Sequence, residues 1–184
     1  MNKLIGDFRH LFKQFEITDD LINMYLVFMG VRSACLIGNI NMFYVMPEKA
    51  KLEIYYARYP GFNKTKIDYP LVCLKDSIVS QNIQKHGNEL TEQDLGLYLG
   101  FNCFNQDWSN LRINRYGIKY SLNGIAFYNE VCSIQPDVGM LSRIRFKAKT
   151  MTAALKLIDP KFVVRYSIEF LPKLGPKKSH KTKT

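Results

Sequence analysis

Arg143, Arg145, Lys147 and Lys149 place four positive charges at every second residue late in the chain. The chemistry that guanidinium and ammonium groups offer at this spacing is the binding of anionic groups such as phosphates. Like charges this close repel one another unless an anion screens them, so the pattern predicts a negatively charged partner. A solvated basic surface without a partner is the simpler alternative.

Three other segments also concentrate basic residues: a loop rich in Gly and Pro at 59–68, the segment 111–120, and the C-terminal tail. Cations meet phosphates, and an aromatic neighbour such as Phe62 can stack on an unpaired base. The residues that we predict to contact RNA are Arg58, Phe62, Lys64, Lys66, Arg112, Arg115, Lys119, Arg143, Arg145, Lys147, Lys177, Lys178 and Lys181.

The overall charge supports a polyanionic partner. The chain has 184 residues, 47% of them hydrophobic, and a net charge of +10. This length and composition suffice for one compact core, and the charge favours nucleic acid or an anionic membrane surface as the partner. Four basic segments on a small domain favour RNA, because no segment has the pattern of a DNA recognition helix.

The sequence shows no catalytic pattern. Its three histidines, His10, His86 and His180, fall in a predicted helix, a loop and the tail, without a carboxylate or thiol at a known spacing. Motifs of the Gly-rich phosphate-loop, GxSxG and HExxH types are lacking. We therefore predict a protein that is not an enzyme and that needs no cofactor.

The four cysteines are widely separated and contain no CxxC pair. That spacing is poor for a zinc site and gives no sign of a disulfide framework. We predict that each is a small core residue in a reducing compartment and that the chain binds no metal. They are Cys35, Cys73, Cys103 and Cys132.

The elements around the four cations follow from residue spacing. The alternation over Arg143–Lys149 predicts a strand with cations on one face and apolar side chains on the other. Thr150 can cap a helix, and the apolar spacing from 151 to 158 predicts that an amphipathic helix follows. Residues 136–139 contain Pro, Asp and Gly and predict a turn before this strand.

The remaining segments predict an α+β fold, with an antiparallel sheet and helices packed mainly on one face. The helices do not alternate strictly with the strands, which argues against a parallel sheet. Residues 3–16 have helical spacing. The predicted strands are Leu21–Val31, Lys51–Arg58, Tyr69–Ile78, Tyr120–Phe127 and Phe162–Phe170.

We predict two parts in the chain, an RNA-binding domain at 1–160 and an extension with a Lys-rich tail at 161–184. The longest apolar run, Leu21–Val31, is too short to span a bilayer. The N-terminus does not resemble a signal peptide, because no basic region precedes an apolar one, and it does not resemble a mitochondrial presequence, because acidic residues come early.

A series of short motifs occurs in a fixed order. YSL at 120–122 is followed by an apolar strand, GM at 139–140, IRFKAKT at 144–150 and a helix rich in Ala and Leu. Earlier come MGV at 29–31, AR at 57–58, GF at 61–62 and YP at 69–70. This order, over about residues 1–158, resembles the bacterial-type family of large-subunit ribosomal protein five, which binds 5S ribosomal RNA.

The resemblance implies a structural role in translation, in the central protuberance of the large ribosomal subunit. Its implied partners are large-subunit rRNA, 5S rRNA where the particle has it, the elbow of P-site tRNA, and neighbouring ribosomal proteins including the small-subunit head. It implies no membrane partner. The family loop that matches residues 57–68 reaches toward the tRNA elbow. The resemblance therefore implies RNA contact for Arg58, Phe62, Lys64 and Lys66.

The sequence departs from the family pattern in three places. Residues 81–110 are more acidic and aromatic than the family's basic region, the loop at 59–68 is less basic, and 161–184 lies beyond the usual end. The chain is also rich in Asn, Ile, Lys, Tyr and Phe, a usage typical of AT-rich genomes. We therefore expect a divergent member of the family in a mitochondrial ribosome, encoded either in the organelle or in the nucleus.

A viral matrix or nucleocapsid-associated structural protein is the alternative interpretation. Its size, basic character and AT-rich residue usage would be similar. Such a protein would self-associate at low salt and pellet with anionic liposomes, whereas a ribosomal protein would do neither specifically.

Overall fold

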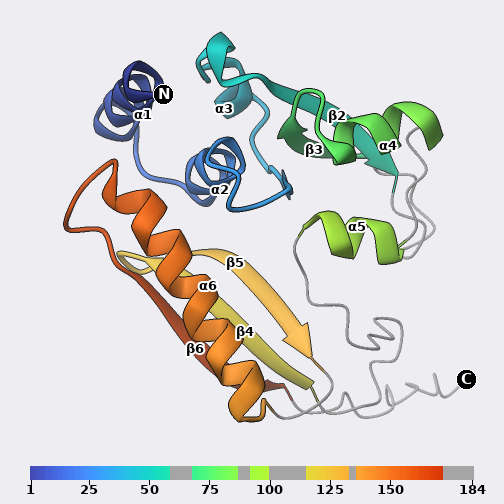
Figure 1. Cartoon of the computed structure of the whole chain (residues 1–184), viewed down its shortest axis with the longest axis vertical. Helices are drawn as coiled ribbons and strands as arrows, with labels where there is room; N and C mark the ends of the chain where they lie inside the picture. The colour runs from blue at the N-terminus through green and yellow to red at the C-terminus, as the bar shows by residue number, and fades with distance from the viewer. Residues whose placement is uncertain (59–67, 87–91, 100–114, 133–135, 172–184) are drawn as a thin grey trace, which may run out of the picture.

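The computed structural model describes residues 1–58, 68–86, 92–99, 115–132 and 136–171. Within them, two three-stranded antiparallel sheets have the strand orders β1-β3-β2 and β5-β4-β6 (Figure 1). The helices are α1 (Asn2–Gln14), α2 (Asp19–Phe28), α3 (Asn41–Tyr44), α4 (Ile78–His86), α5 (Glu92–Tyr98) and α6 (Val138–Lys156). The strands are β1 (Ala34–Leu36), β2 (Leu52–Arg58), β3 (Asp68–Leu74), β4 (Arg115–Leu122), β5 (Ile125–Cys132) and β6 (Val164–Leu171). The predicted α+β class is confirmed, with two sheets in place of one.

α2 lies at the centre of the molecule, in contact with both sheets. The strand predicted at Leu21–Val31 is wrong, although its burial is correct: every residue from Asp20 to Val27 is buried. The Thr18 hydroxyl accepts a hydrogen bond from Leu21 N, which starts the helix, and Gly30 at φ +69° follows its end. A helix that is apolar all round suits a fully enclosed position.

The first sheet has helices on both faces. One face joins the main core around α2, through Cys35 and Val72. On the other face Leu71 and Cys73 pack with apolar residues of α4 and α5, including Val79 and Leu95. The predicted placement of helices mainly on one face is therefore wrong for this sheet.

The second sheet is built on a β4–β5 hairpin. Its turn residues Asn123 and Gly124 have positive φ values of 51° and 87°, as a tight hairpin turn requires. The single strand predicted at Tyr120–Phe127 is therefore wrong, because the chain reverses in its middle. β6 pairs with β4 over its full length, so the strand predicted at Phe162–Phe170 is confirmed.

α6 covers one face of the second sheet (Figure 1). It runs without interruption through Arg143–Lys149, so the strand predicted there is wrong. The Asp137 carboxylate caps the helix by accepting a hydrogen bond from Met140 N at 2.7 Å. Thr150, predicted as the cap, lies inside the helix, and the turn predicted at 136–139 contains the cap itself and the first residues of α6.

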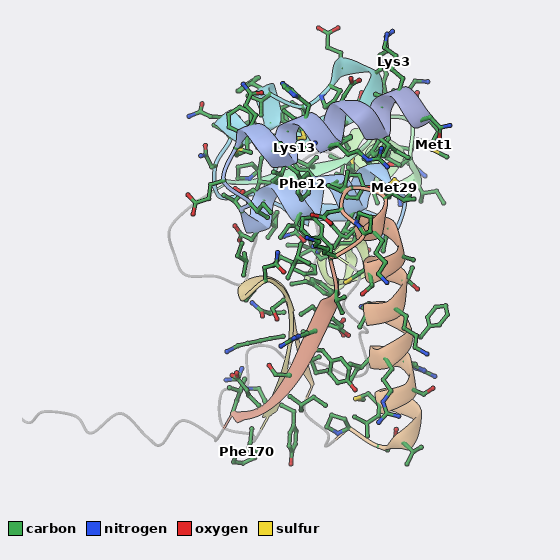
Figure 2. The ribbon with its side chains drawn as sticks, turned by 90° about the vertical axis from the view of Figure 1, so that its left-hand side faces the viewer. Met1, Lys3, Phe12, Lys13, Met29 and Phe170 are labelled. Carbon is green, nitrogen blue, oxygen red and sulfur yellow. The ribbon has the colours of Figure 1, made fainter. Side chains whose placement is uncertain are left out.

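α1 confirms the helix predicted at 3–16 and packs on α2 through aromatic side chains (Figure 2). The ring of Phe8 stacks on Phe28 at 4.7 Å between centroids and meets Tyr25 edge-on at 5.1 Å. Tyr25 in turn donates a hydrogen bond from its hydroxyl to the Ala154 carbonyl of α6 at 2.9 Å. These contacts join α1, α2 and α6 in one core.

We expect Tyr25→Phe to lower the free energy of unfolding by about 1 kcal/mol at neutral pH, because it removes the hydrogen bond to Ala154. Burial raises the pKa of Tyr25 from 10.0 to about 12. The unfolded state therefore ionises first as the pH rises from 10 to 12, and stability present below pH 10 is lost. Urea unfolding across this range should show a shallower alkaline loss in Tyr25→Phe than in the native chain. An equal loss in both would contradict the assignment.

Candidate nucleic-acid interface

α6 carries five cations and no acidic residue along its 19 residues. Because a helix turns about 100° per residue, the side chains separate onto two flanks. Arg145, Lys149 and Lys156 share the flank toward β6, whereas Arg143 and Lys147 share the flank toward β5. The four cations of 143–149 thus do not form the single face that the strand prediction required.

On the flank toward β5, Lys147 makes contacts within the chain. Its ammonium pairs with the carboxylate of Glu130, lies 3.1 Å from the hydroxyl of Tyr128, and stands 4.8 Å from the centre of that ring. Glu130 is 5% exposed. The chain itself therefore supplies the anion that Lys147 meets.

A second cation, the buried Arg32, also lies over the Tyr128 ring. Its guanidinium carbon is 4.3 Å from the ring centre, and its Nη groups donate to Asn23 Oδ1 and to the Leu99 carbonyl, the latter at 3.1 Å. Burial lowers the pKa of Arg32, and Glu130 is among the groups that oppose this shift. The sequence prediction missed this network, because its members are distant in the chain and carry no motif.

On the flank toward β6, a groove of about 670 Å³ runs between α6 and β6. None of the described residues that line it is acidic, whereas four are cations. They are Arg145, Lys149, Lys156 and Arg165. All four are exposed to solvent. The residue spacing singled out Arg145 and Lys149 as part of the cationic pattern and missed Lys156 and Arg165.

The predicted residues of β4 lie on the second sheet. Lys119 is exposed, and its ammonium pairs with the Glu169 carboxylate of β6 at 2.7 Å. Arg115 is half-buried at the start of β4. The structure therefore separates these two from the α6 groove, and Lys119 has its own counter-ion.

The other predicted RNA contacts are not placed by the structure. Arg58 ends β2, where its backbone faces Asp68 of β3, and its side chain is not described. The rest of the set lies outside the described residues: Phe62, Lys64, Lys66, Arg112, Lys177, Lys178 and Lys181.

A polar cluster between β2 and α4 was also missed. The Tyr55 hydroxyl donates to Glu53 at 2.8 Å, and the buried Ser80 hydroxyl donates to the same carboxylate oxygen at 2.9 Å. Gln84 donates to the Tyr55 oxygen at 3.0 Å. These bonds satisfy a half-buried carboxylate, and we assign the cluster to the packing of α4 on the sheet.

In the parts of the chain that the structure describes, no three His, Cys, Asp or Glu side chains gather closely enough to hold a metal ion. Cys35 and Cys73 are buried free thiols, and burial raises their pKa values to about 12 and about 11. The described helices include none with the length and apolar content needed to cross a membrane.

The fold and this surface define an α+β protein with a cationic helix on one side of its second sheet. Comparison with protein families, with curated proteins and with solved structures found no match to the chain.

Proposed function

We propose that the chain is an RNA-binding structural protein of a large ribosomal subunit. The observation that carries the proposal is α6, an exposed helix with five cations and no acid, one flank of which opens into a basic groove. A surface of this kind neutralises phosphates without requiring a catalytic group. The net charge of +10 and the Lys-rich tail add to the same attraction.

The ribosomal part of the proposal rests on the order of the short motifs. YSL lies in β4, the apolar strand is β5, and GM and KAKT both lie in α6. The structure differs from the family pattern at two places. Where the resemblance implies a strand at 143–149 and a strand end at 29–31, the chain has α6 and the end of α2. The particular site proposed is the central protuberance of a mitochondrial ribosome, near 5S rRNA where present, the P-site tRNA elbow and the small-subunit head.

Sedimentation of a native lysate through a sucrose gradient at moderate salt tests this assignment. We expect the chain to migrate with the large ribosomal subunit and to remain there after nuclease trimming of polysomes. Raising the salt should release it progressively, since phosphate contacts exchange with counter-ions. Immunodetection of the chain in each fraction, beside a known large-subunit protein, gives the result.

Migration at the top of the gradient, or in a membrane or virion fraction, would contradict the ribosomal assignment. The second of these results would favour the viral matrix alternative. A matrix protein should also self-associate at low salt and pellet with vesicles that contain anionic lipid. The same purified chain can be measured for both properties.

A further inference from the structure

We propose that the groove between α6 and β6 binds the phosphate backbone of an unpaired RNA strand, with Arg145, Lys149, Lys156 and Arg165 as its phosphate ligands. This inference rests on the proposed RNA-binding function and assigns it to one place in the fold. It differs from the sequence prediction, which put the contact on one face of a strand at 143–149. Because the segment is a helix, only Arg145 and Lys149 of those cations line the groove, together with Lys156 and Arg165.

The spacing of the cations fits a run of phosphates. Arg145, Lys149 and Lys156 lie along one stripe of α6, and from the first to the last the helix rises about 16 Å at 1.5 Å per residue. This length is enough for the stripe to meet more than one phosphate of an unpaired strand, as in proteins whose basic grooves follow the backbone of single-stranded nucleic acid. Arg165 approaches the same groove from β6. The charges therefore line both walls.

Within the described parts of the chain, the cations of the groove have no acidic partner. Among the described residues, no carboxylate forms an ion pair with Lys149, Lys156 or Arg165. Arg145 donates to the neutral Tyr166 hydroxyl at 3.3 Å, which orients the guanidinium and leaves its charge uncompensated. By contrast, Lys119 and Lys147 each pair with a glutamate. The groove thus brings four cations without a described carboxylate partner together at one place in the fold.

The other lining residues give the groove an apolar floor. Ala148 and Val164 are buried, and Val163 lies at the rim. The hydroxyl of Thr152 already accepts a hydrogen bond from Val164 N at 3.0 Å, which joins the two walls. The four cations themselves are exposed, so each contact between cation and phosphate has the modest strength of a surface ion pair. The floor also offers contact area to ribose.

Phe146 favours an unpaired strand over a duplex. Its side chain is 72% exposed, and it stands three residues before Lys149, on the adjoining face of α6. Exposed aromatic rings next to cations stack on bases that are free of a partner, whereas double-stranded RNA keeps its bases within the helix. We assign Phe146 as the stacking site for a base next to the bound phosphates.

The placement of the cations on two neighbouring elements, α6 and β6, favours a strand that lies between them over an anionic membrane. A bilayer presents a flat layer of headgroups, and the cations on the groove walls would meet it along one rim. A flexible RNA strand can enter the groove and place phosphates between the two walls. Membrane binding is therefore the competing result of the test below.

The test compares two full-length variants that each lack four positive charges of the native chain. The groove variant combines Arg145→Gln, Lys149→Gln, Lys156→Gln and Arg165→Gln. The matched control combines Lys3→Gln, Lys49→Gln, Lys75→Gln and Lys85→Gln, all at exposed positions outside the groove. Circular dichroism and thermal unfolding confirm that both variants fold.

Binding is measured with a single-stranded RNA oligonucleotide of mixed sequence over a series of salt concentrations. We expect the groove variant to bind roughly tenfold to a hundredfold more weakly than the native chain, and the control severalfold more weakly at most. Removing one phosphate ligand should lower the salt slope by about 0.7 for a single strand. Phe146→Ala should weaken binding with no change in that slope, because it removes stacking and no charge.

Equal weakening in the groove variant and the control would overturn the proposal, because the net charge alone would then explain binding. Loss of binding to vesicles of phosphatidylserine and phosphatidylcholine, with RNA binding unchanged, would overturn it in favour of a membrane surface. If the chain does not migrate with ribosomes and the groove variant still binds RNA selectively more weakly, the ribosomal assignment fails and the groove assignment stands. If the chain migrates with ribosomes and the groove variant binds RNA as tightly as the native chain does, the ribosomal assignment stands and the groove assignment fails.

Discussion

Glu130→Ala should lower the free energy of unfolding by about 3–5 kcal/mol, because it leaves a cation without its anion inside the protein. Glu130 is 5% exposed, and its carboxylate pairs with Lys147, whose side chain is 26% exposed. Arg32 lies over the ring of Tyr128, and the negative charge of Glu130 favours the charged form of Arg32. Urea unfolding at neutral pH, followed by circular dichroism, measures the change.

An exposed ion pair in the same sheet provides the matched control. Glu169 pairs with Lys119 at 2.7 Å, and both side chains are nearly half exposed. Glu169→Ala should cost about 0–1 kcal/mol, because water replaces the missing carboxylate. The double variant Glu130→Met with Lys147→Met should recover most of the stability, since neither charge then remains buried. Equal costs for Glu130→Ala and Glu169→Ala would show that the Glu130 pair is open to solvent.

The pair also shows what the sequence could not indicate about Lys147, which has a carboxylate partner within the chain. Lys147 belongs to the group of Arg143, Arg145 and Lys149 because four cations alternate with apolar residues. Nothing near Lys147 in the sequence indicates Glu130, which reaches it because α6 packs on the sheet that contains β5. Ion pairs between distant segments depend on the fold, so the sequence could indicate the charges and not their partners.

The helical spacing of apolar residues would have predicted α6, but the alternation of cations and apolar residues at 143–149 favoured a strand. Leu141, Ile144, Ala148, Met151 and Leu155 follow helical spacing across the whole segment, and the helix interior has no proline. Asp137 stands three residues before Met140, as an N-cap requires. The period of two was local to 143–149, whereas the helical period extends through the whole of α6.

α2 shows a different limit. A continuous apolar run of this length suits a buried strand and a buried helix equally, and periodicity cannot separate them. The deciding features are local: the Thr18 cap, the acidic residues Asp19 and Asp20 in the first turn, and Gly30 after the end. The strands β2 and β6 had clearer boundaries in proline, glycine and charge, and their positions were predicted well. The strand predicted at Tyr69–Ile78 is too long, because β3 ends at Leu74 and α4 begins at Ile78.

The candidate groove could be predicted in part. Its chemistry was indicated by Arg145 and Lys149, because their residue types are visible in the sequence. Its location depends on the packing of α6 against β6, which brings Lys156 and Arg165 to the same place. Neither belongs to the alternating pattern, so the tertiary structure was needed to find them.

Phe8→Ala should lower the free energy of unfolding by about 3–5 kcal/mol, because it empties a site between α1 and α2. The Phe8 side chain is 0% exposed and contacts the rings of Tyr25 and Phe28. Since Tyr25 also bonds to α6, the cavity should weaken the whole core and not α1 alone. Urea unfolding should show a lower midpoint with a similar slope, if unfolding stays two-state.

Phe146→Ala is the control of equal size, and it also tests the structure of α6. With Phe146 72% exposed on a helix, this change should alter stability by no more than about 0.5 kcal/mol. In a strand over 143–149, Phe146 would share the core face with Ile144 and Ala148, and its removal would cost as much as that of Phe8. Similar costs for both substitutions would therefore contradict the helix, and with it the division of the cations that forms the groove. A much larger cost for Phe8→Ala than for Phe146→Ala would show that Phe146 lies on the surface, where it can stack on a base.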